Sequence, residues 1–162
     1  MRIARITISD RACAGIYEDR SGPVIDRILS DAFPPGVDFV SILLPDEAAL
    51  ISAKLRELAD VDQCNLIVTT GGTGISPRDV TPEATRAVLE RELPGFGEAM
   101  RMCSLSRVPT AVLSRAIAGT RGQSLILNLP GKPSAARECL DILLPAIREG
   151  ITLLRGEDPH IT

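Results

Sequence analysis

The stretch of this chain that most directly suggests chemistry is Cys64–Thr81, where an apolar run ends in a glycine cluster. The cluster consists of Gly71, Gly72, Thr73 and Gly74. Small residues at such a point let backbone N–H groups approach a phosphate, and the start of a following helix favours negative charge. The spacing is neither the dinucleotide pattern G-x-G-x-x-G nor a P-loop. On its own, the cluster fits either a phosphate cradle or a tight strand-to-helix turn.

Two aspartates follow expected strands and could work with such a cradle. Asp79 lies just before the helix start at Thr81, and Asp46 follows Pro45 at the end of another apolar run. Either acid could simply cap a helix. Either could instead bind Mg²⁺, which prefers carboxylate oxygens and takes its remaining ligands from water and phosphates. Two carboxylates from different loops would suit a metal-assisted nucleotidyl transfer, in which the metal neutralises charge as pyrophosphate leaves.

Two further polar loops also follow expected strands. In the first, Ser9-Asp10-Arg11, Asp10 could contact a ribose or purine edge and Arg11 an anion, or the two could form a local ion pair. The second, Asn128–Ser134, offers backbone N–H groups, Lys132 and the Ser134 hydroxyl as a second anion site, or is an ordinary turn before a helix. The only histidine, His160, is close to the end of the sequence, which argues against a Ser/His/Asp or Cys/His nucleophile.

Composition narrows the class of protein. The net charge of −3 and pI near 5.2 argue against a nucleic-acid or membrane-surface binder, and one Tyr with three Phe leaves few stacking platforms. The four cysteines form no C-x-x-C pair, which disfavours a zinc site. No signal segment or membrane-length apolar run is evident, so we expect a cytoplasmic protein with free thiols.

The periodicity of apolar residues predicts alternating strands and helices that would position these loops. Strands are expected at 2–9, 37–44 and 64–70, and a hairpin pairs 110–118 with 123–129 around Gly119–Gly122. Helices are expected at 24–32, 46–60, 81–92, 96–106 and 134–148, with a frayed tail from Arg155. This order predicts a single domain over residues 1–162, a three-layer α/β/α fold with a mainly parallel sheet and a small hairpin. Its ligands should bind at the carboxyl ends of the strands, where all four loops fall.

Taken together, the motifs resemble the molybdopterin adenylyltransferase family, which includes the MogA and MoaB proteins and the G domains of gephyrin and of plant Cnx-type proteins. The matching segments span nearly the whole chain. They are Ser9–Ala12, Gly15–Asp19, Leu44–Glu47, Thr69–Gly74, Arg78–Thr85, Leu93–Glu98 and Asn128–Pro133. The Gly15–Asp19 segment is closer to MogA than to MoaB.

The resemblance implies a reaction and a role for each matched residue. Enzymes of this family transfer AMP from Mg-ATP to molybdopterin and release pyrophosphate, and a partner protein or domain then inserts molybdate. Asp46 and Asp79 would be the catalytic acids and magnesium ligands. The nucleotide would contact Asp10, Gly71, Gly72, Thr73 and Gly74. Molybdopterin would contact Ser9, Arg11, Pro130, Gly131, Lys132 and Ser134.

The family also forms trimers, so a homotrimer is expected. Two alternatives remain open from the sequence: a molybdopterin carrier that transfers no AMP, and a trimeric scaffold. The presence of both Asp46 and Asp79 favours the enzyme over the carrier. No long partner-binding extension is evident to favour the scaffold.

Overall fold

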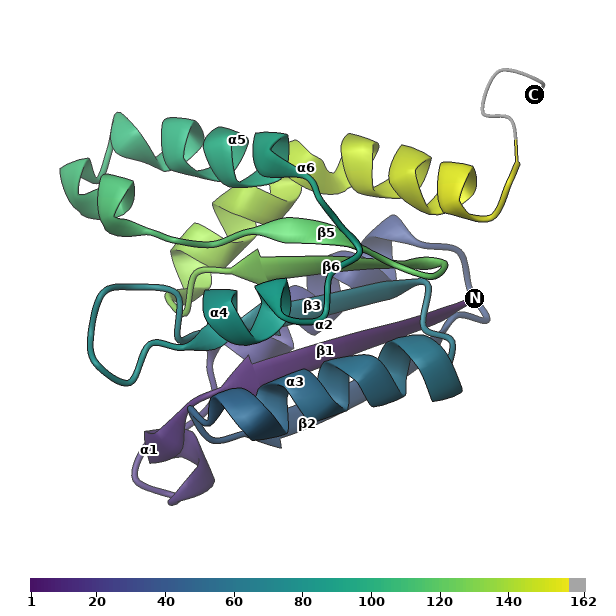
Figure 1. Cartoon of the computed structure of the whole chain (residues 1–162). Coiled ribbons are helices and arrows are strands. Elements are labelled where there is room, and N and C mark those ends of the chain that lie inside the picture. The colour runs from purple at the N-terminus through teal and green to yellow at the C-terminus, as the bar shows by residue number, and fades with distance from the viewer. Residues whose placement is uncertain (158–162) are drawn as a thin grey trace.

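A computed structural model describes residues 1–157 of the chain and places six strands in one sheet (Figure 1). The strands lie in the order β2-β1-β3-β6-β5-β4. Their bounds are β1 Arg2–Ile8, β2 Asp38–Leu44, β3 Leu66–Thr70, β4 Arg91–Glu92, β5 Ala118–Arg121 and β6 Ser124–Leu129. None of the helices in residues 1–157 is both long enough and apolar enough to span a membrane.

The four strands β2, β1, β3 and β6 are parallel, so their carboxyl ends share one edge of the sheet. β1 pairs with β2 on one side and with β3 on the other, and both pairs are parallel. The order in which strands are added to the sheet therefore reverses at β1. All five residues of β3 are buried, as its continuous apolar sequence predicts. A reversal of strand order opens a crevice at the carboxyl edge, where α/β proteins bind ligands.

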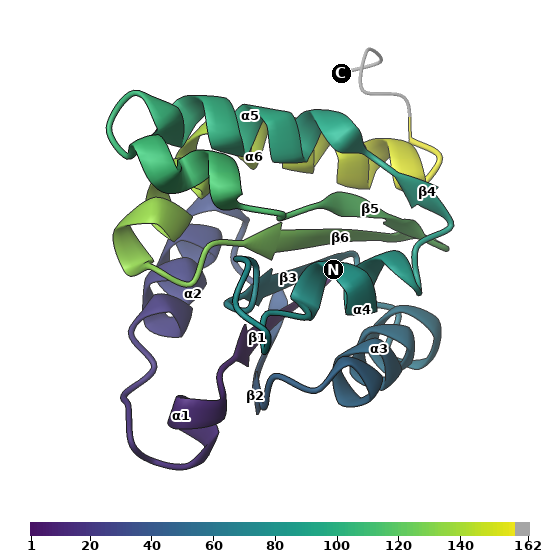
Figure 2. The same ribbon diagram turned by 60° about the vertical axis from the view of Figure 1, so that its left-hand side comes forward.

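Helices cover both faces of the sheet and confirm the predicted three-layer architecture (Figures 1 and 2). On one face, α2 (Ser21–Ala32), α5 (Pro94–Leu105) and α6 (Pro133–Leu154) enclose a core that includes Leu29, Leu127 and Leu140. On the other face, α3 (Ala48–Arg56) and α4 (Thr81–Arg86) enclose a smaller core around Leu55 and Ile67. The short α1 (Asp10–Cys13) extends from the carboxyl edge and has no buried residue.

The hairpin is present, but its predicted first strand was wrong. Residues Pro109–Leu113 form a 3-10 helix, and β5 begins only at Ala118. The exposed side chains of Val112 and Leu113 explain the error, because both are apolar and Val112 is β-branched, although their segment lies outside the sheet. The hairpin turn is therefore at Gly122-Gln123, since β5 pairs antiparallel with β6 as far as Arg121↔Ser124.

Helix boundaries also differ from those predicted. α2 begins at Ser21 because Pro23 is tolerated in a first helical turn, where its missing N–H is not needed. α3 begins at Ala48 with Glu47 as its N-cap and ends in a π-helical turn, Glu57–Val61. The Ser9-Asp10-Arg11 loop contains α1, for which Ser9 is the N-cap.

Two other helices differ in length. α4 ends at Arg86, six residues early, since the chain turns back so that the Glu90 N–H can donate to Thr120. This turn also produces the two-residue strand β4, which the sequence analysis missed. α6 continues to Leu154 because its apolar period extends through Ile147 and Ile151. Arg155–Glu157 close its end by backbone hydrogen bonds, while the rest of the expected frayed tail, including His160, lies outside the described residues.

Candidate active site

A cleft of about 400 Å³ lies at the carboxyl ends of β1 and β3, beside α1 and the start of α6. It brings together the loops that follow β1, β2, β3 and β6. Its lining includes the predicted site residues Ser9, Asp10, Arg11, Asp46, Gly71, Gly72, Asp79 and Gly131. Most of the predicted site therefore converges in one place.

The glycine loop is held in a conformation that requires glycine. Gly71 and Gly72 have positive φ angles of 101° and 62°, and a Cβ atom on Gly71 would lie 2.3 Å from the carbonyl oxygen of Ile8. The Thr81 hydroxyl donates to the Gly71 carbonyl at 2.9 Å, and the Thr81 N–H donates to the Gly72 carbonyl at 3.1 Å. The two carbonyls are thereby turned toward α4.

Three backbone N–H groups of this loop have no acceptor among residues 1–157. They belong to Gly72, Thr73 and Gly74. Unpaired N–H groups in a glycine-rich loop can hydrogen-bond an anionic oxygen, as in other phosphate-binding loops. Gly72 lines the cleft directly, whereas the Thr73 side chain is buried behind it.

Asp10 and Asp46 fasten the first two loops to each other. The Asp10 N–H donates to Asp46 Oδ2 at 2.9 Å, and the Asp46 N–H donates to Asp10 Oδ1 at 3.0 Å. Arg78, from the third loop, donates to both carboxylate oxygens of Asp10 at 2.9 and 3.0 Å. Asp46 therefore is not a helix cap, and Asp10 forms its ion pair with Arg78 and not with Arg11, the partner that one of the two alternatives from the sequence gave it.

The surroundings of Asp10 and Asp46 shift the pKa values of their carboxyl groups in opposite directions. The hydrogen bonds from Arg78, and then that from the Asp46 N–H, hold the pKa of Asp10 below its usual range. Burial raises the pKa of the Asp46 carboxyl, and the negative charges of Asp10 and Asp79 raise it further against the opposing hydrogen bond from the Asp10 N–H. Asp46 therefore lies where a positive charge would be stabilising.

Asp79 belongs to a loop that is fixed from a distant part of the chain. Its Oδ2 accepts the Ser76 N–H at 2.8 Å, so it closes a local turn and does not cap α4. Arg115 donates to the carbonyl oxygens of Gly74 and Asp79 at 2.6 and 2.7 Å and forms an ion pair with Glu83. The Arg115 N–H also donates to the Thr73 carbonyl at 2.9 Å.

The predicted molybdopterin residues do not all face this cleft. Pro130, Lys132 and Ser134 line a second cavity of about 320 Å³, whose other walls come mainly from α5 and the 3-10 helix. Gly131 faces the main cleft, because its backbone packs against Gly71 and leaves only 3.2 Å between a Cβ atom at this position and the Gly71 Cα. The Asn128–Ser134 loop thus lies between two cavities.

The donor set fits a divalent cation that arrives with a phosphate ligand. Within residues 1–157, no group of three or more His, Cys, Asp or Glu side chains could hold a metal ion unaided. Magnesium commonly binds through one or two carboxylates together with substrate phosphates. Asp46, whose charge is crowded by Asp10 and Asp79, provides a carboxylate of this kind.

Several cleft residues were missed by the sequence analysis. The lining of the cleft also includes Thr7, Tyr17, Asp19, Arg20, Ser21 and Thr70. Arg115 does not line the cleft, but it donates to the Gly74 carbonyl of the glycine loop. The Gly15–Asp19 motif was a usable signal for Tyr17 and Asp19. Nothing in the sequence near Arg115 indicates its role, because its contacts depend on the path of a loop about forty residues away.

Comparison with known proteins decides the family. The family described as a probable molybdopterin binding domain matches residues 4–149. The chain belongs to this family. It is 51% identical to the molybdopterin adenylyltransferase of Helicobacter pylori (strain ATCC 700392 / 26695), covering 96% of this chain and 89% of the relative.

Two further members extend the comparison. The molybdopterin adenylyltransferase of Escherichia coli (strain K12) is 47% identical over 96% of this chain and 79% of its own length. The crystal structure of the molybdopterin biosynthesis enzyme MoaB from Thermus thermophilus has a TM-score of 0.87 and 43% identity, with 96% of this chain and 97% of that chain covered. The resemblance to the MogA/MoaB family and the mainly parallel α/β fold are thereby confirmed.

Proposed function

We propose that this chain is a molybdopterin adenylyltransferase of molybdenum cofactor biosynthesis, a nucleotidyltransferase that uses ATP as its substrate. The observation that supports this most strongly is the convergence of the glycine loop with Asp46 and Asp79 in one cleft. Relatives that are 47–51% identical to this chain over an alignment covering 96% of it carry this name.

In the proposed reaction, a phosphate oxygen of molybdopterin attacks the α-phosphorus of ATP. A new P–O bond forms as the bond to pyrophosphate breaks, so AMP is transferred and pyrophosphate leaves. The N–H groups of Gly72 and its neighbours donate to phosphate oxygens where negative charge accumulates. Arg78 adds positive charge at the mouth of the cleft while holding Asp10 in place.

Asp46 and Asp79 are the proposed magnesium ligands. When bound with ATP, Mg²⁺ neutralises phosphate charge and promotes departure of pyrophosphate. Asp46 is suited to this role because its position is fixed by Asp10, while only one of its two carboxylate oxygens accepts a hydrogen bond within residues 1–157. The remaining oxygen, Oδ1, faces Gly72, since a Cβ atom there would lie 2.8 Å from it.

The remaining assignments belong to the same proposal. Ser9, Arg11 and Gly131 would contact molybdopterin from the main cleft, with Pro130, Lys132 and Ser134 extending the contact from the second cavity. Asp10, Thr73 and Gly74 would bind nucleotide. A single functional domain, a cytoplasmic location and delivery of the product to a molybdate-inserting protein stay predictions.

The homotrimer expected from the family also belongs to this proposal. Exposed apolar side chains on α5 and the 3-10 helix offer a surface for self-association, among them Met102, Leu105, Val112 and Leu113. Analytical ultracentrifugation of the purified protein should give three times the 17.3 kDa mass of one chain. A monomer at all concentrations would exclude this part of the proposal.

Variants of the two acids test the function. Purified protein with Mg-ATP and molybdopterin should release pyrophosphate, and Asp46→Ala or Asp79→Ala should lower kcat by about 10²-fold or more. Glu47→Ala is the matched control, since Glu47 is an exposed neighbour of Asp46 that does not line the cleft. Normal turnover in Asp46→Ala and Asp79→Ala would remove both assigned roles.

A further inference from the structure

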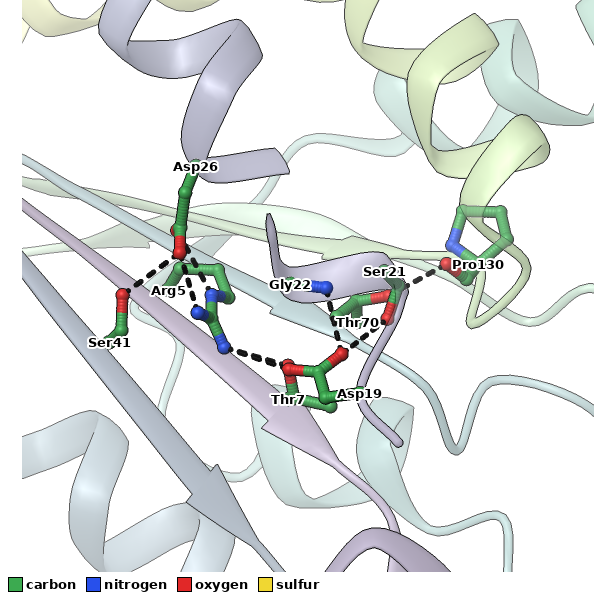
Figure 3. Close-up of polar contacts among 9 residues, drawn as sticks. All are labelled: Arg5, Thr7, Asp19, Ser21, Gly22, Asp26, Ser41, Thr70 and Pro130. Atoms are coloured by element: carbon green, nitrogen blue, oxygen red, sulfur yellow. Dashed lines mark hydrogen bonds and ion pairs between the residues drawn. The ribbon is translucent and has the colours of Figure 1, made fainter. Parts of the chain in front are cut away.

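A nearly buried polar cluster connects β1 to the start of α2 (Figure 3). The Arg5 guanidinium donates to both oxygens of Asp26 at 3.0 and 2.6 Å and to Asp19 Oδ2 at 3.2 Å. The Thr7 hydroxyl accepts from Arg5 at 2.8 Å and donates to the same oxygen of Asp19 at 2.6 Å. Asp19 is therefore held from β1 by two donors.

The other oxygen of Asp19 organises the first turn of α2. Asp19 Oδ1 accepts the Gly22 N–H at 2.8 Å and the Ser21 hydroxyl at 3.3 Å (Figure 3). A Cβ atom on Gly22 would lie 2.3 Å from Asp19 Oδ2 and 2.6 Å from Arg5 Cζ, so a glycine is needed for this contact. Asp19 thus supplies the capping hydrogen bond that the N-cap residue, Arg20, does not provide.

The segment between Asp10 and Asp19 has almost no other anchor. Its α1 helix has no buried residue, and Gly15–Glu18 are exposed. Asp10 fixes one end through Asp46 and Arg78, and Asp19 fixes the other end through Arg5 and Thr7. The position of the side chains between these two aspartates therefore depends on polar contacts more than on apolar packing.

Those side chains place two positive charges on one wall of the cleft. The guanidinium groups of Arg11 and Arg20 lie 5.3 and 5.9 Å from the centre of the Tyr17 ring, and all three residues line the cleft. Within residues 1–157, Arg11 has no ion pair, and Arg20 has only a 3.9 Å contact with the well-exposed Glu18. Guanidinium groups held on an aromatic ring and open to a cleft are suited to bind phosphate oxygens.

We propose that Arg11, Tyr17 and Arg20 form a phosphate-binding wall of the cleft and that Asp19 is its positioning residue. The ligand chemistry is a phosphate group, which both proposed substrates carry. In naming those substrates, the inference rests on the proposed function. Asp26 holds the same arginine, but it contacts Ser41 and does not line the cleft, so its role is confined to stability.

This difference between two partners of one arginine allows a matched test. Asp19→Asn keeps an acceptor for the Gly22 N–H but loses the charge that faces Arg5, and Asp26→Asn removes the equivalent charge on the other side of Arg5. Asp19→Asn should raise KM for ATP or for molybdopterin about tenfold, with a smaller change in kcat, because a displaced wall binds substrate poorly. Asp26→Asn should lower Tm about as much as Asp19→Asn does, but it should keep the wild-type KM values for both substrates.

The substrate whose KM rises identifies which phosphate contacts the wall. Arg20→Ala should raise the same KM, and the double variant Asp19→Asn/Arg20→Ala should show less than the product of the two single effects. Wild-type KM for both substrates in Asp19→Asn would overturn the proposal, as would equal KM changes in Asp19→Asn and Asp26→Asn. Because Arg20 is exposed, Arg20→Ala should fold even if Asp19→Asn does not. Wild-type KM values in Arg20→Ala would therefore also overturn the proposal.

The dissociation constants of ATP and molybdopterin, measured by calorimetry on the same variants, separate this proposal from the proposed function. Absence of AMP transfer by the wild-type protein would reject the adenylyltransferase. Weaker ligand binding in Asp19→Asn than in Asp26→Asn would still support the wall.

Discussion

Replacing Gly72 with alanine should damage both the fold of the glycine loop and the catalytic acid beside it. An added Cβ atom would lie 2.4 Å from Thr81 Oγ1 and 2.8 Å from Asp46 Oδ1, both too close for any side chain. The backbone would also keep a residue other than glycine at a φ of 62°. Either the loop or the Asp46 carboxylate must move.

The structure gives the magnitude of each loss. A left-handed φ costs alanine about 1 kcal/mol relative to glycine. Displacing the Thr81 hydroxyl from the Gly71 carbonyl costs about 1 kcal/mol more, so the free energy of unfolding should fall by about 2 kcal/mol. Because Asp46 Oδ1 is displaced as well, kcat for AMP transfer should fall about 10²-fold.

Gly156→Ala is a matched control for this variant. Gly156 has a φ of 73° just beyond the end of α6, no atom lies within 4 Å of its added Cβ, and α6 separates it from the cleft by roughly 30 Å. It should lose only about 1 kcal/mol of stability and keep full activity. Denaturant unfolding of Gly72→Ala and Gly156→Ala tests the expected losses of stability, and pyrophosphate release by the same variants tests the expected activities. Wild-type kcat in Gly72→Ala would refute the reasoning that the glycine loop and Asp46 fit against each other.

Other predictions concern the supports of the site and core. Arg115→Lys loses the planar fork that holds the Gly74 and Asp79 carbonyls, so kcat/KM measured by steady-state kinetics should fall about tenfold. Arg86 forms an exposed ion pair with Glu92, so the control variant Arg86→Lys should keep the wild-type kcat/KM. Asn128→Ala leaves the buried hydroxyls of Thr69 and Thr85 without their amide donor and should cost about 2–4 kcal/mol in urea unfolding; a loss below ~1 kcal/mol would contradict this. Burial raises the pKa of the Cys64 and Cys139 thiols from 9.0 to about 11, so both should resist a thiol reagent at pH 8 until the protein unfolds. Since the folded pKa of each thiol is the higher one, their contribution to stability should be complete below pH 9.0 and lost as pH rises toward 11, which thermal unfolding across this range would test.

The central strands and the edge that carries the site could be predicted because their signals are local. β-branched runs at β1 and β3, each followed by polar or glycine-rich loops, are enough to place Asp10 and Gly71 at one edge of a parallel sheet. The prediction for 110–118 failed for a physical reason: Val112 and Leu113 are exposed on a 3-10 helix, and an apolar pattern does not reveal which side is buried.

The interactions inside the site depend on contacts that no local pattern encodes. The sequence predicts Asp46 at the carboxyl edge of the sheet, either as a helix cap or as a magnesium ligand, but it gives no sign that the Asp46 carboxylate accepts a hydrogen bond from the Asp10 N–H. Arg78 pairs with Asp10 across 68 residues, and Arg115 donates to the Gly74 carbonyl across 41 residues. Such pairings follow from how loops cross the carboxyl edge after the sheet has formed.

The most direct test of the central claim follows the label from ATP. Purified protein would be incubated with molybdopterin, Mg²⁺ and ATP labelled at the α-phosphate, and the pterin product would be separated by chromatography. The account predicts label in the pterin fraction, one equivalent of pyrophosphate for each labelled molecule, and transfer slowed by about 10²-fold or more in Asp46→Ala. Tight binding of molybdopterin with all label remaining in ATP would contradict it and identify a carrier instead.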